Sequence, residues 1–211
     1  MVNLSEEKNR LINELIKQGF LQRQDIIKAF RQVKRERFLP KNLKDNAYDN
    51  YPLPIGEGQT ISQPLTIAAM TEALQPQKGQ KILEVGAGSG YQAAILAEIV
   101  GPDGRVITTE RIENLVEFAK KNLKKYDNVT VVNCDGSSGY PKEAPYDRII
   151  VTASAPEIPE PLVDQLNKHG RMVIPVGDEM FLVEKENNRA KRTFLGHYVF
   201  VPLLGEYGYK G

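Results

Sequence analysis

Three glycines separated by single residues are the first place where this sequence could support chemistry. Gly86, Gly88 and Gly90 follow an apolar run at 82–85 and precede another at 91–97. Glycine adopts left-handed backbone conformations at little cost and lets a ligand approach the main chain closely. In an open α/β sheet, ligands bind at the turn that joins a strand to the following helix. The pattern therefore predicts a nucleotide-type site at this turn.

The spacing of the glycines favours one class of ligand. A dinucleotide fingerprint reads G-x-G-x-x-G, and its third glycine would fall at position 91, where this chain has Tyr91. The observed G-x-G-x-G spacing argues against NAD and for S-adenosyl-L-methionine (SAM), which has no pyrophosphate to bind at the helix. SAM is therefore the predicted cofactor, with S-adenosyl-L-homocysteine as its product.

Acidic residues stand where the next two predicted strands end. Glu110 follows the strand 105–109 and could accept hydrogen bonds from both ribose hydroxyls of the cofactor. Asp135 comes shortly after the strand 129–133, and with Gly136 it could present a carboxylate and an amide to an adenine edge. Both acids could instead be ordinary helix N-caps. Their positions after successive strands favour the SAM site.

A long polar loop supplies a candidate for substrate binding. It runs from Pro40 to Gln63, and long ordered loops in compact domains are commonly functional. A structural cover over the sheet edge is the alternative. Near its end, Ser62 precedes Pro64, a favoured first residue of a helix. Its hydroxyl could therefore be a helix cap, or it could hold a substrate carboxylate at the helix N-terminus.

The elements that must position these residues alternate along the chain. Two amphipathic helices are predicted at 5–18, beginning at Ser5, and at 25–33. From Pro64 onwards we predict helices at 64–74, 90–100, 112–125 and 159–168, and strands at 81–85, 105–109, 129–133, 147–152 and 171–176. Such alternation predicts an α/β fold with a doubly wound, mostly parallel sheet and an N-terminal helical extension.

The pattern changes after Gly177. Two alternating runs, 180–185 and 192–202, are joined by Asn187, Asn188 and Arg189. Alternation of this kind across a short polar turn predicts an antiparallel hairpin, which would form the edge of the sheet.

Bulk properties bound the function. With 211 residues, 41% of them hydrophobic, the chain can bury one substantial core. A net charge of +1 gives no reason to expect a nucleic-acid groove. One cysteine, Cys134, excludes an internal disulfide framework, and the start lacks a signal-peptide profile. No apolar run approaches membrane-spanning length. We therefore expect a cytoplasmic protein that binds neither membrane nor nucleic acid, and we find no metal-site pattern.

Several longer blocks together resemble one enzyme family. In order and spacing they are typical of protein-L-isoaspartate O-methyltransferases: Arg35–Pro40, Gly58–Pro64, Leu83–Tyr91, Ala144–Ala153, Ile158–Leu162 and Gly170–Gly177. The similarity covers about residues 8–208. The glycine loop marks SAM-dependent methyltransferases in general, whereas the blocks around 60–64 and 144–148 point to this family.

The resemblance implies a fold, a reaction and a set of site residues. The fold would be that of a Rossmann-like class I SAM-dependent methyltransferase, as a single domain over 1–211. Within it, 1–63 would hold the N-terminal helices and the binding loop, 64–177 the core, and 178–211 the hairpin and a closing tail. The substrate would be the α-carboxylate of L-isoaspartyl residues in damaged proteins and peptides, methylated as the first step of repair through a succinimide. Apart from the resemblance, we expect a monomer.

By the same resemblance, Ser62 is the catalytic residue, donating a hydrogen bond that orients the substrate carboxylate. The residues implied to bind the cofactor are Gln59, Thr60, Ile61, Ser62, Gly86, Gly88, Ser89, Glu110, Arg111, Asp135 and Gly136. Leu204 replaces a threonine of some relatives and Cys134 replaces an expected glycine, so contacts at these positions differ from theirs.

No histidine is expected to act as a base. His169 is predicted at a helix C-terminus and His197 in an edge strand. Two other functions stay open: a SAM methyltransferase for RNA or a small molecule, and a non-catalytic adaptor that binds isoaspartyl chains. Residues 151–156 lack the Asn/Asp-Pro-Pro-aromatic motif of amino-methylating enzymes, and intact Ser62, Glu110 and Asp135 argue against an adaptor.

Overall fold

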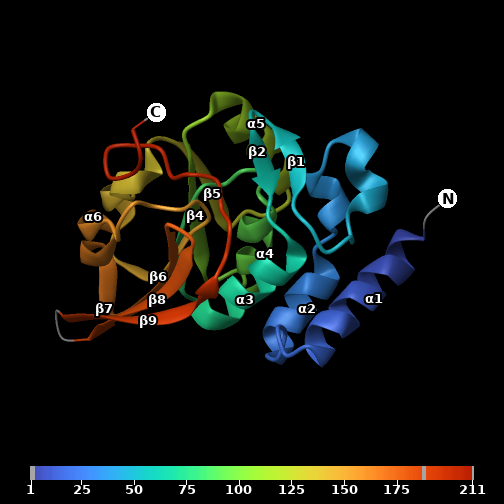
Figure 1. Cartoon of the computed structure of the whole chain (residues 1–211), viewed down its shortest axis with the longest axis horizontal. Helices are drawn as coiled ribbons and strands as arrows, with labels where there is room; N and C mark the ends of the chain where they lie inside the picture. The colour runs from blue at the N-terminus through green and yellow to red at the C-terminus, as the bar shows by residue number, and fades with distance from the viewer. Residues whose placement is uncertain (1–2, 187–188, 211) are drawn as a thin grey trace.

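A seven-stranded sheet forms the centre of the computed structural model, which describes residues 3–186 and 189–210. The strand order is β5-β4-β3-β6-β7-β8-β9 (Figure 1). The strands are β3 (Lys81–Val85), β4 (Arg105–Glu110), β5 (Val129–Asn133), β6 (Tyr146–Val151), β7 (Leu166–Val176), β8 (Glu179–Glu186) and β9 (Arg189–His197). Strands β3 to β7 pair in parallel, whereas β8 and β9 pair antiparallel. The predicted fold class is confirmed.

Alternate residues of the strands face different layers. Ile82, Ile150 and Val173 join a core with the N-terminal helices and with α3 (Pro64–Leu74), α4 (Tyr91–Val100) and α5 (Glu113–Leu123). Their neighbours Leu83 and Ile149 join a second core with the short α6 (Glu160–Asp164) and the tail. Period-2 alternation produces this division, because successive side chains of a strand point to opposite faces.

The two predicted N-terminal helices are present as α1 (Leu4–Lys17) and α2 (Gln24–Gln32), which pack at one end of the molecule (Figure 1). The predicted start at Ser5 is wrong, because Asn3 caps α1 and its side chain accepts a hydrogen bond from the Glu6 amide at 3.4 Å. The cap residue of a helix lies outside the apolar periodicity, so the pattern alone placed it poorly.

The polar loop before α3 is more ordered than we expected. It contains the 3-10 helix η2 (Lys41–Asn46) and a hairpin of β1 (Leu53–Gly56) and β2 (Gln59–Ile61), and another 3-10 helix, η1 (Arg35–Phe38), directly precedes it. The hairpin turn places Glu57 at φ 54° and Gly58 at φ 68°. Strands this short carry little alternation, which explains why the pattern did not predict them.

The segment after β6 corrects three predictions: the end of the helix, the start of the next strand, which we predicted at 171, and the place of His169. Helix α6 ends at Asp164, not at 168, because β7 already begins at Leu166. His169 therefore lies on an exposed part of β7 and not at a helix end. The Lys185 Nζ donates to the main-chain carbonyls of Val163, Asp164 and Leu166 and so stabilises this early helix end.

The predicted edge hairpin is present, with different limits. Strand β9 ends at His197, whereas we predicted a strand to 202. The segment 198–202 instead leaves the sheet and crosses to the end of β6, where the Ser154 amide donates to the Val201 carbonyl at 2.8 Å. Asn187 and Asn188 of the predicted turn lie outside the described residues.

Candidate functional site

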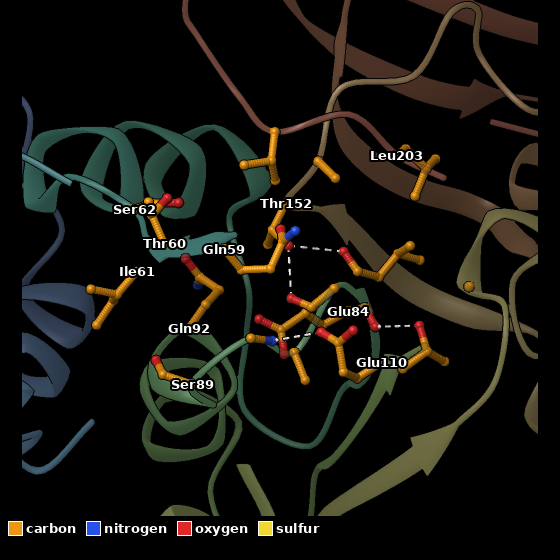
Figure 2. Close-up of a pocket in the computed structure, with 18 of the residues that line it drawn as sticks. Gln59, Thr60, Ile61, Ser62, Glu84, Ser89, Gln92, Glu110, Thr152 and Leu203 are labelled. Atoms are coloured by element: carbon orange, nitrogen blue, oxygen red, sulfur yellow. Dashed lines mark hydrogen bonds between the residues drawn. The ribbon is translucent and has the colours of Figure 1, made fainter. Parts of the chain in front are cut away.

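A cavity opens at the carboxyl ends of β3, β4 and β6, where parallel sheets bind ligands (Figure 2). Ten of the eleven predicted cofactor residues line it, with Asp135 the exception: Gln59, Thr60, Ile61, Ser62, Gly86, Gly88, Ser89, Glu110, Arg111 and Gly136. Its remaining lining residues are Ile67, Met70, Glu84, Val85, Ala87, Tyr91, Gln92, Thr109, Ile112, Thr152, Ala153, Val201, Pro202, Leu203 and Leu204.

The glycine loop forms the floor of this cavity between β3 and α4. Gly86, Gly88 and Gly90 have φ values of 95°, 52° and 86°, which side chains rarely adopt. A Cβ at Gly86 would lie 2.3 Å from the Thr152 Oγ1, and one at Gly90 would lie 2.8 Å from the Leu123 Cδ1. The loop therefore needs glycine both for its backbone angles and for the packing behind it.

Glu110 holds this loop from the end of β4. Its Oε2 accepts a hydrogen bond from the Gly88 amide at 3.0 Å, and its Oε1 accepts one from the Ile112 amide at 3.0 Å. Ile112, not Glu110, is the N-cap residue of α5. Because each carboxylate oxygen has two lone pairs, Glu110 can still accept hydrogen bonds from a ligand.

Asp135 has a different position from the one we expected. The carboxylate does cap η3 (Gly136–Ser138), because its Oδ1 accepts from the Ser137 amide at 2.9 Å. Its Oδ2 accepts from the Glu206 amide of the tail at 2.7 Å. Gly136 lines the cavity whereas Asp135 does not, so the contact of Asp135 with adenine stays a prediction.

Ser62 lies between β2 and α3 at the wall of the cavity. The helix-cap alternative is wrong, because Gln63 is the N-cap of α3 and the first turn is held by Asn50, whose Oδ1 accepts from the Leu65 amide at 3.0 Å. Among the described residues the Ser62 hydroxyl has no hydrogen-bond partner. It is therefore available to a ligand.

The sequence argument missed Glu84, which is the most unusual group in the cavity. Its side chain is 0% exposed, and its two carboxylate oxygens have no partner among the described residues. Burial raises the pKa of Glu84 to about 8; the nearby Thr108 hydroxyl opposes this rise and the charge of Glu110 adds to it. A charge in a buried strand normally needs a partner, so an acid two residues before the first glycine was a signal for a binding site.

The cavity fits the predicted cofactor. Figure 2 shows Glu84 and Glu110 close together, with Ser62 apart from them at the start of α3. Two acids suit a ligand with the sulfonium and ammonium cations of SAM, and the glycine loop leaves room for close approach. Over residues 3–186 and 189–210, no cluster of three or more His, Cys, Asp or Glu could hold a metal ion. No helix in the same ranges is long and apolar enough to span a membrane.

Comparisons with known proteins agree with this geometry. A family profile described as protein-L-isoaspartate(D-aspartate) O-methyltransferase matches residues 6–208. The protein-L-isoaspartate O-methyltransferase of Methanopyrus kandleri is 53% identical over 211 residues, covering 96% of this chain and 93% of the relative. The enzyme of the same name from Hyperthermus butylicus is 47% identical over 220 residues, covering 97% of this chain and 91% of that relative.

Solved structures give the same result. One called protein-L-isoaspartate O-methyltransferase matches with a TM-score of 0.88 and 32% identity over 95% of this chain and 67% of the other. A Plasmodium falciparum structure described as a beta-aspartate methyltransferase in complex with S-adenosyl-L-homocysteine has a TM-score of 0.82 and 27% identity, covering 92% of this chain and 97% of the other. Because the family profile and these relatives match nearly its whole length, the chain belongs to the protein-L-isoaspartate O-methyltransferase family of SAM-dependent enzymes.

Proposed function

We propose that the chain transfers a methyl group from SAM to the α-carboxylate of L-isoaspartyl residues in damaged proteins and peptides. The observation that carries this proposal is the Ser62 hydroxyl, which lines the cavity and caps no helix, in a chain of this family. Isoaspartyl residues arise when asparagine deamidates or aspartate isomerises. The methyl ester recloses to a succinimide, and hydrolysis of the succinimide returns some normal aspartate.

The cofactor would bind along the glycine loop. SAM, when bound, supplies an electrophilic methyl group on a sulfonium sulfur. Glu110 would accept hydrogen bonds from the ribose hydroxyls while it keeps the Gly88 amide in place at 3.0 Å. Glu84 would face the cationic part of the cofactor, because its carboxylate is fully buried and has no partner among the described residues. Gln59 to Ser62, Gly86, Ser89, Arg111 and Gly136 would complete the wall.

The substrate needs orientation more than activation. An α-carboxyl group has a pKa near 3.5 and is ionised at neutral pH, so no general base is required. Neither histidine of the chain lines the cavity; His169 and His197 lie on β7 and β9. The Ser62 hydroxyl would donate to one carboxylate oxygen and hold the other towards the methyl group. Such positioning contributes up to about 7–11 kcal/mol in favourable intramolecular cases.

Methyl transfer to matched peptides tests the proposal. We expect an isoaspartyl peptide to accept a radiolabelled methyl group from SAM at least about a hundred times more efficiently than its aspartyl twin. This difference corresponds to about 2.7 kcal/mol in transition-state binding and follows from misplacing the carboxylate by about 1 Å. Comparable rates on the two peptides would contradict the substrate. Transfer to RNA or a small molecule instead, or SAM binding without transfer, would favour the two alternative functions.

Location, oligomeric state and the roles of the three segments are also proposed. We propose a cytoplasmic monomer that acts on isoaspartyl proteins and not on nucleic acid, consistent with its net charge of +1. We further propose that 1–63 binds substrate and cofactor, 64–177 forms the core, and 178–211 closes the site as one domain. Light scattering measures the oligomeric state, and limited proteolysis tests whether the three segments separate.

A further inference from the structure

A second pocket lies between η1 and the carboxyl end of α5, apart from the cofactor cavity. Five of the residues that line it are basic: Lys34, Arg37, Lys121, Lys124 and Lys125. Among the residues that the structure describes, no Asp or Glu lines this pocket, and it shares no lining residue with the cavity. Because the whole chain carries a net charge of only +1, positive charge is concentrated here and the rest of the chain is net acidic.

Most of these basic side chains are not neutralised by neighbouring acids. Lys125 pairs with Glu98, with 4.0 Å between its Nζ and the Glu98 Oε1. Within 3–186 and 189–210, the other four basic residues of the pocket form no ion pair. Four positive charges of the pocket therefore remain available to a ligand.

Lys8 shows how closely the positive charges are gathered. Its Nζ donates to two main-chain carbonyls at the end of α2. Burial lowers the pKa of Lys8, Glu36 opposes this change, and the charges of Lys34 and Lys125 lower the pKa further. Lys34 and Lys125 come from opposite sides of the pocket, yet both charges act on the same ammonium group. A bound anion would relieve this repulsion, because an opposite charge favours the charged form of each lysine.

Helix dipoles explain only part of this arrangement. Helix α2 ends at Gln32 and α5 ends at Leu123, and basic residues near a helix C-terminus are favourable. Each helix end carries only about half a unit of negative charge, so the two ends together offset about one of the five positive charges. The excess of positive charge in the pocket is therefore not explained by the helices that end there.

The pocket suits a compact ligand that carries several negative charges. Lysine binds phosphate as a point charge, and the planar guanidinium of Arg37 can donate to two phosphate oxygens at once. The Tyr126 hydroxyl also belongs to this pocket, is buried and has no hydrogen-bond partner among the described residues, so it is available as a neutral donor. Linked phosphates place about two to four charges on few atoms, whereas an acidic peptide spreads its charges by about 3.3 Å per residue.

We infer that this pocket binds the di- or triphosphate group of a small ligand. The linked phosphates are the chemistry that it recognises, whether they are free in solution or carried by a nucleotide. This binding goes beyond the proposed function, because the pocket is separate from the cavity that contains Ser62 and the glycine loop. The two sites are nevertheless adjacent: Asn122 lines the pocket, and its side chain donates to the carbonyl of Ser89 in the glycine loop at 2.9 Å.

Calorimetric titration of the full chain tests the inference. The buffer contains neither phosphate nor magnesium and has low ionic strength, and S-adenosyl-L-homocysteine is present so that a nucleotide does not enter the cofactor cavity. We expect sodium triphosphate to bind one-to-one and at least about tenfold more tightly than inorganic phosphate, because more negative charges face the same cations. A parallel titration with ATP distinguishes the sources. Tighter binding of ATP than of triphosphate would support a nucleotide, and equal or weaker binding would support free linked phosphates.

Two double variants remove charge from opposite sides of the pocket. One combines Lys34→Gln with Arg37→Gln, and the other combines Lys121→Gln with Lys124→Gln. All four side chains are exposed, so we expect unchanged melting temperatures. Each double variant should weaken triphosphate binding at least about tenfold, because two of the facing charges are lost.

A third double variant, Lys142→Gln with Lys168→Gln, is the matched control. It removes the same charge from exposed residues outside the pocket and should change triphosphate affinity less than about twofold, because salt screens distant charges. Equal losses in the control and in the pocket variants would overturn the inference, since they would reflect net charge alone.

Two other results would also overturn it. One is triphosphate binding no tighter than that of inorganic phosphate. The other is tighter binding of hexaglutamate or of a single-stranded oligonucleotide than of triphosphate, which would assign the pocket to an acidic peptide or to nucleic acid. Triphosphate contains no adenosine and the titrations involve no methyl transfer. Failure of this site and failure of the proposed function are therefore separate results.

Discussion

Asn50 stabilises the start of α3 and Ser62 lines the cavity, two roles that the sequence pattern could not assign to particular residues. Asn50 bonds to the amide of Leu65 in the first turn of α3, whereas Ser62 precedes the N-cap and lines the cavity. A helix start of this kind offers both a cap position and an anion site, and a sequence does not say which hydroxyl or amide fills each.

We therefore predict opposite effects for the two truncations. Ser62→Ala should lower the methylation rate of an isoaspartyl peptide by about ten- to a thousandfold, the loss for one positioned donor, with little change in SAM affinity or melting temperature. Asn50→Ala should cost about 1 kcal/mol of stability. Peptide kinetics and denaturant unfolding of both variants measure this. Normal turnover in Ser62→Ala would remove the serine from the reaction.

Glu84 allows a prediction on pH. In the folded, cofactor-free protein burial raises the pKa of Glu84 from its usual 4.5 to about 8. The unfolded chain thus ionises this group more readily, and the stability associated with the neutral carboxyl is present below pH 4.5 and is lost as the pH rises through about 8. Glu84→Gln removes that loss. The variant should be more stable than the parent by roughly 1–4 kcal/mol at pH 9 and equally stable near pH 4.5.

Denaturant unfolding at the two pH values tests this stability difference. Glu84→Gln should have the opposite effect on SAM binding. At pH 8 the variant should bind SAM about tenfold more weakly than the parent, because a cationic ligand favours the ionised carboxylate. Equal stability of parent and variant at both pH values would mean that Glu84 is ionised in the folded protein.

At the scale of elements, the glycine loop depends on α5 behind it. The Asn122 side chain donates to the Ser89 carbonyl at 2.9 Å, and Leu123 occupies the space beside Gly90. Strand β4 adds Glu110, which bonds to the Gly88 amide. The loop is therefore held by the elements on both sides of its own strand–helix turn.

Gly90→Ala should be destabilising for two reasons that can be separated. Its φ of 86° is strained for alanine, and the new Cβ would lie 2.8 Å from the Leu123 Cδ1. We expect a loss of about 1–3 kcal/mol in unfolding free energy, smaller when Gly90→Ala is made in a Leu123→Ala background. Equal losses in the two backgrounds would show that backbone strain alone accounts for the cost.

At the scale of the whole molecule, cofactor binding joins segments that are far apart in the sequence. The cavity takes residues from β2, the glycine loop, the end of β4 and the tail at 201–204. A ligand in contact with all of them binds only the folded chain. We predict that SAM at a hundred times its dissociation constant raises the unfolding free energy by about 2.7 kcal/mol. Thermal unfolding across a SAM titration measures it, and a melting temperature independent of SAM would contradict the assigned cavity.

The sequence by itself determined the succession of helices and strands along the core, and most of the residues of the cofactor cavity. Alternation of apolar runs predicted β3 to β6 and the helices between them, because burial on both faces leaves a strong pattern. The glycine spacing and Glu110 predicted the cofactor class, since residues at the carboxyl ends of adjacent parallel strands meet at one edge whatever the loops do.

Tertiary structure alone decided the surroundings of three polar groups, Asp135, Ser62 and Glu84. The carboxylate of Asp135 accepts a hydrogen bond from an amide 71 residues away. Ser62 caps no helix, because Asn50 bonds to the first turn of α3. Glu84 lines the cavity although it belongs to an apolar strand. The sequence pattern also did not predict the short β1–β2 hairpin or the early end of α6 at Asp164. Each depends on contacts between residues distant in the chain, and local periodicity carries no information about such contacts.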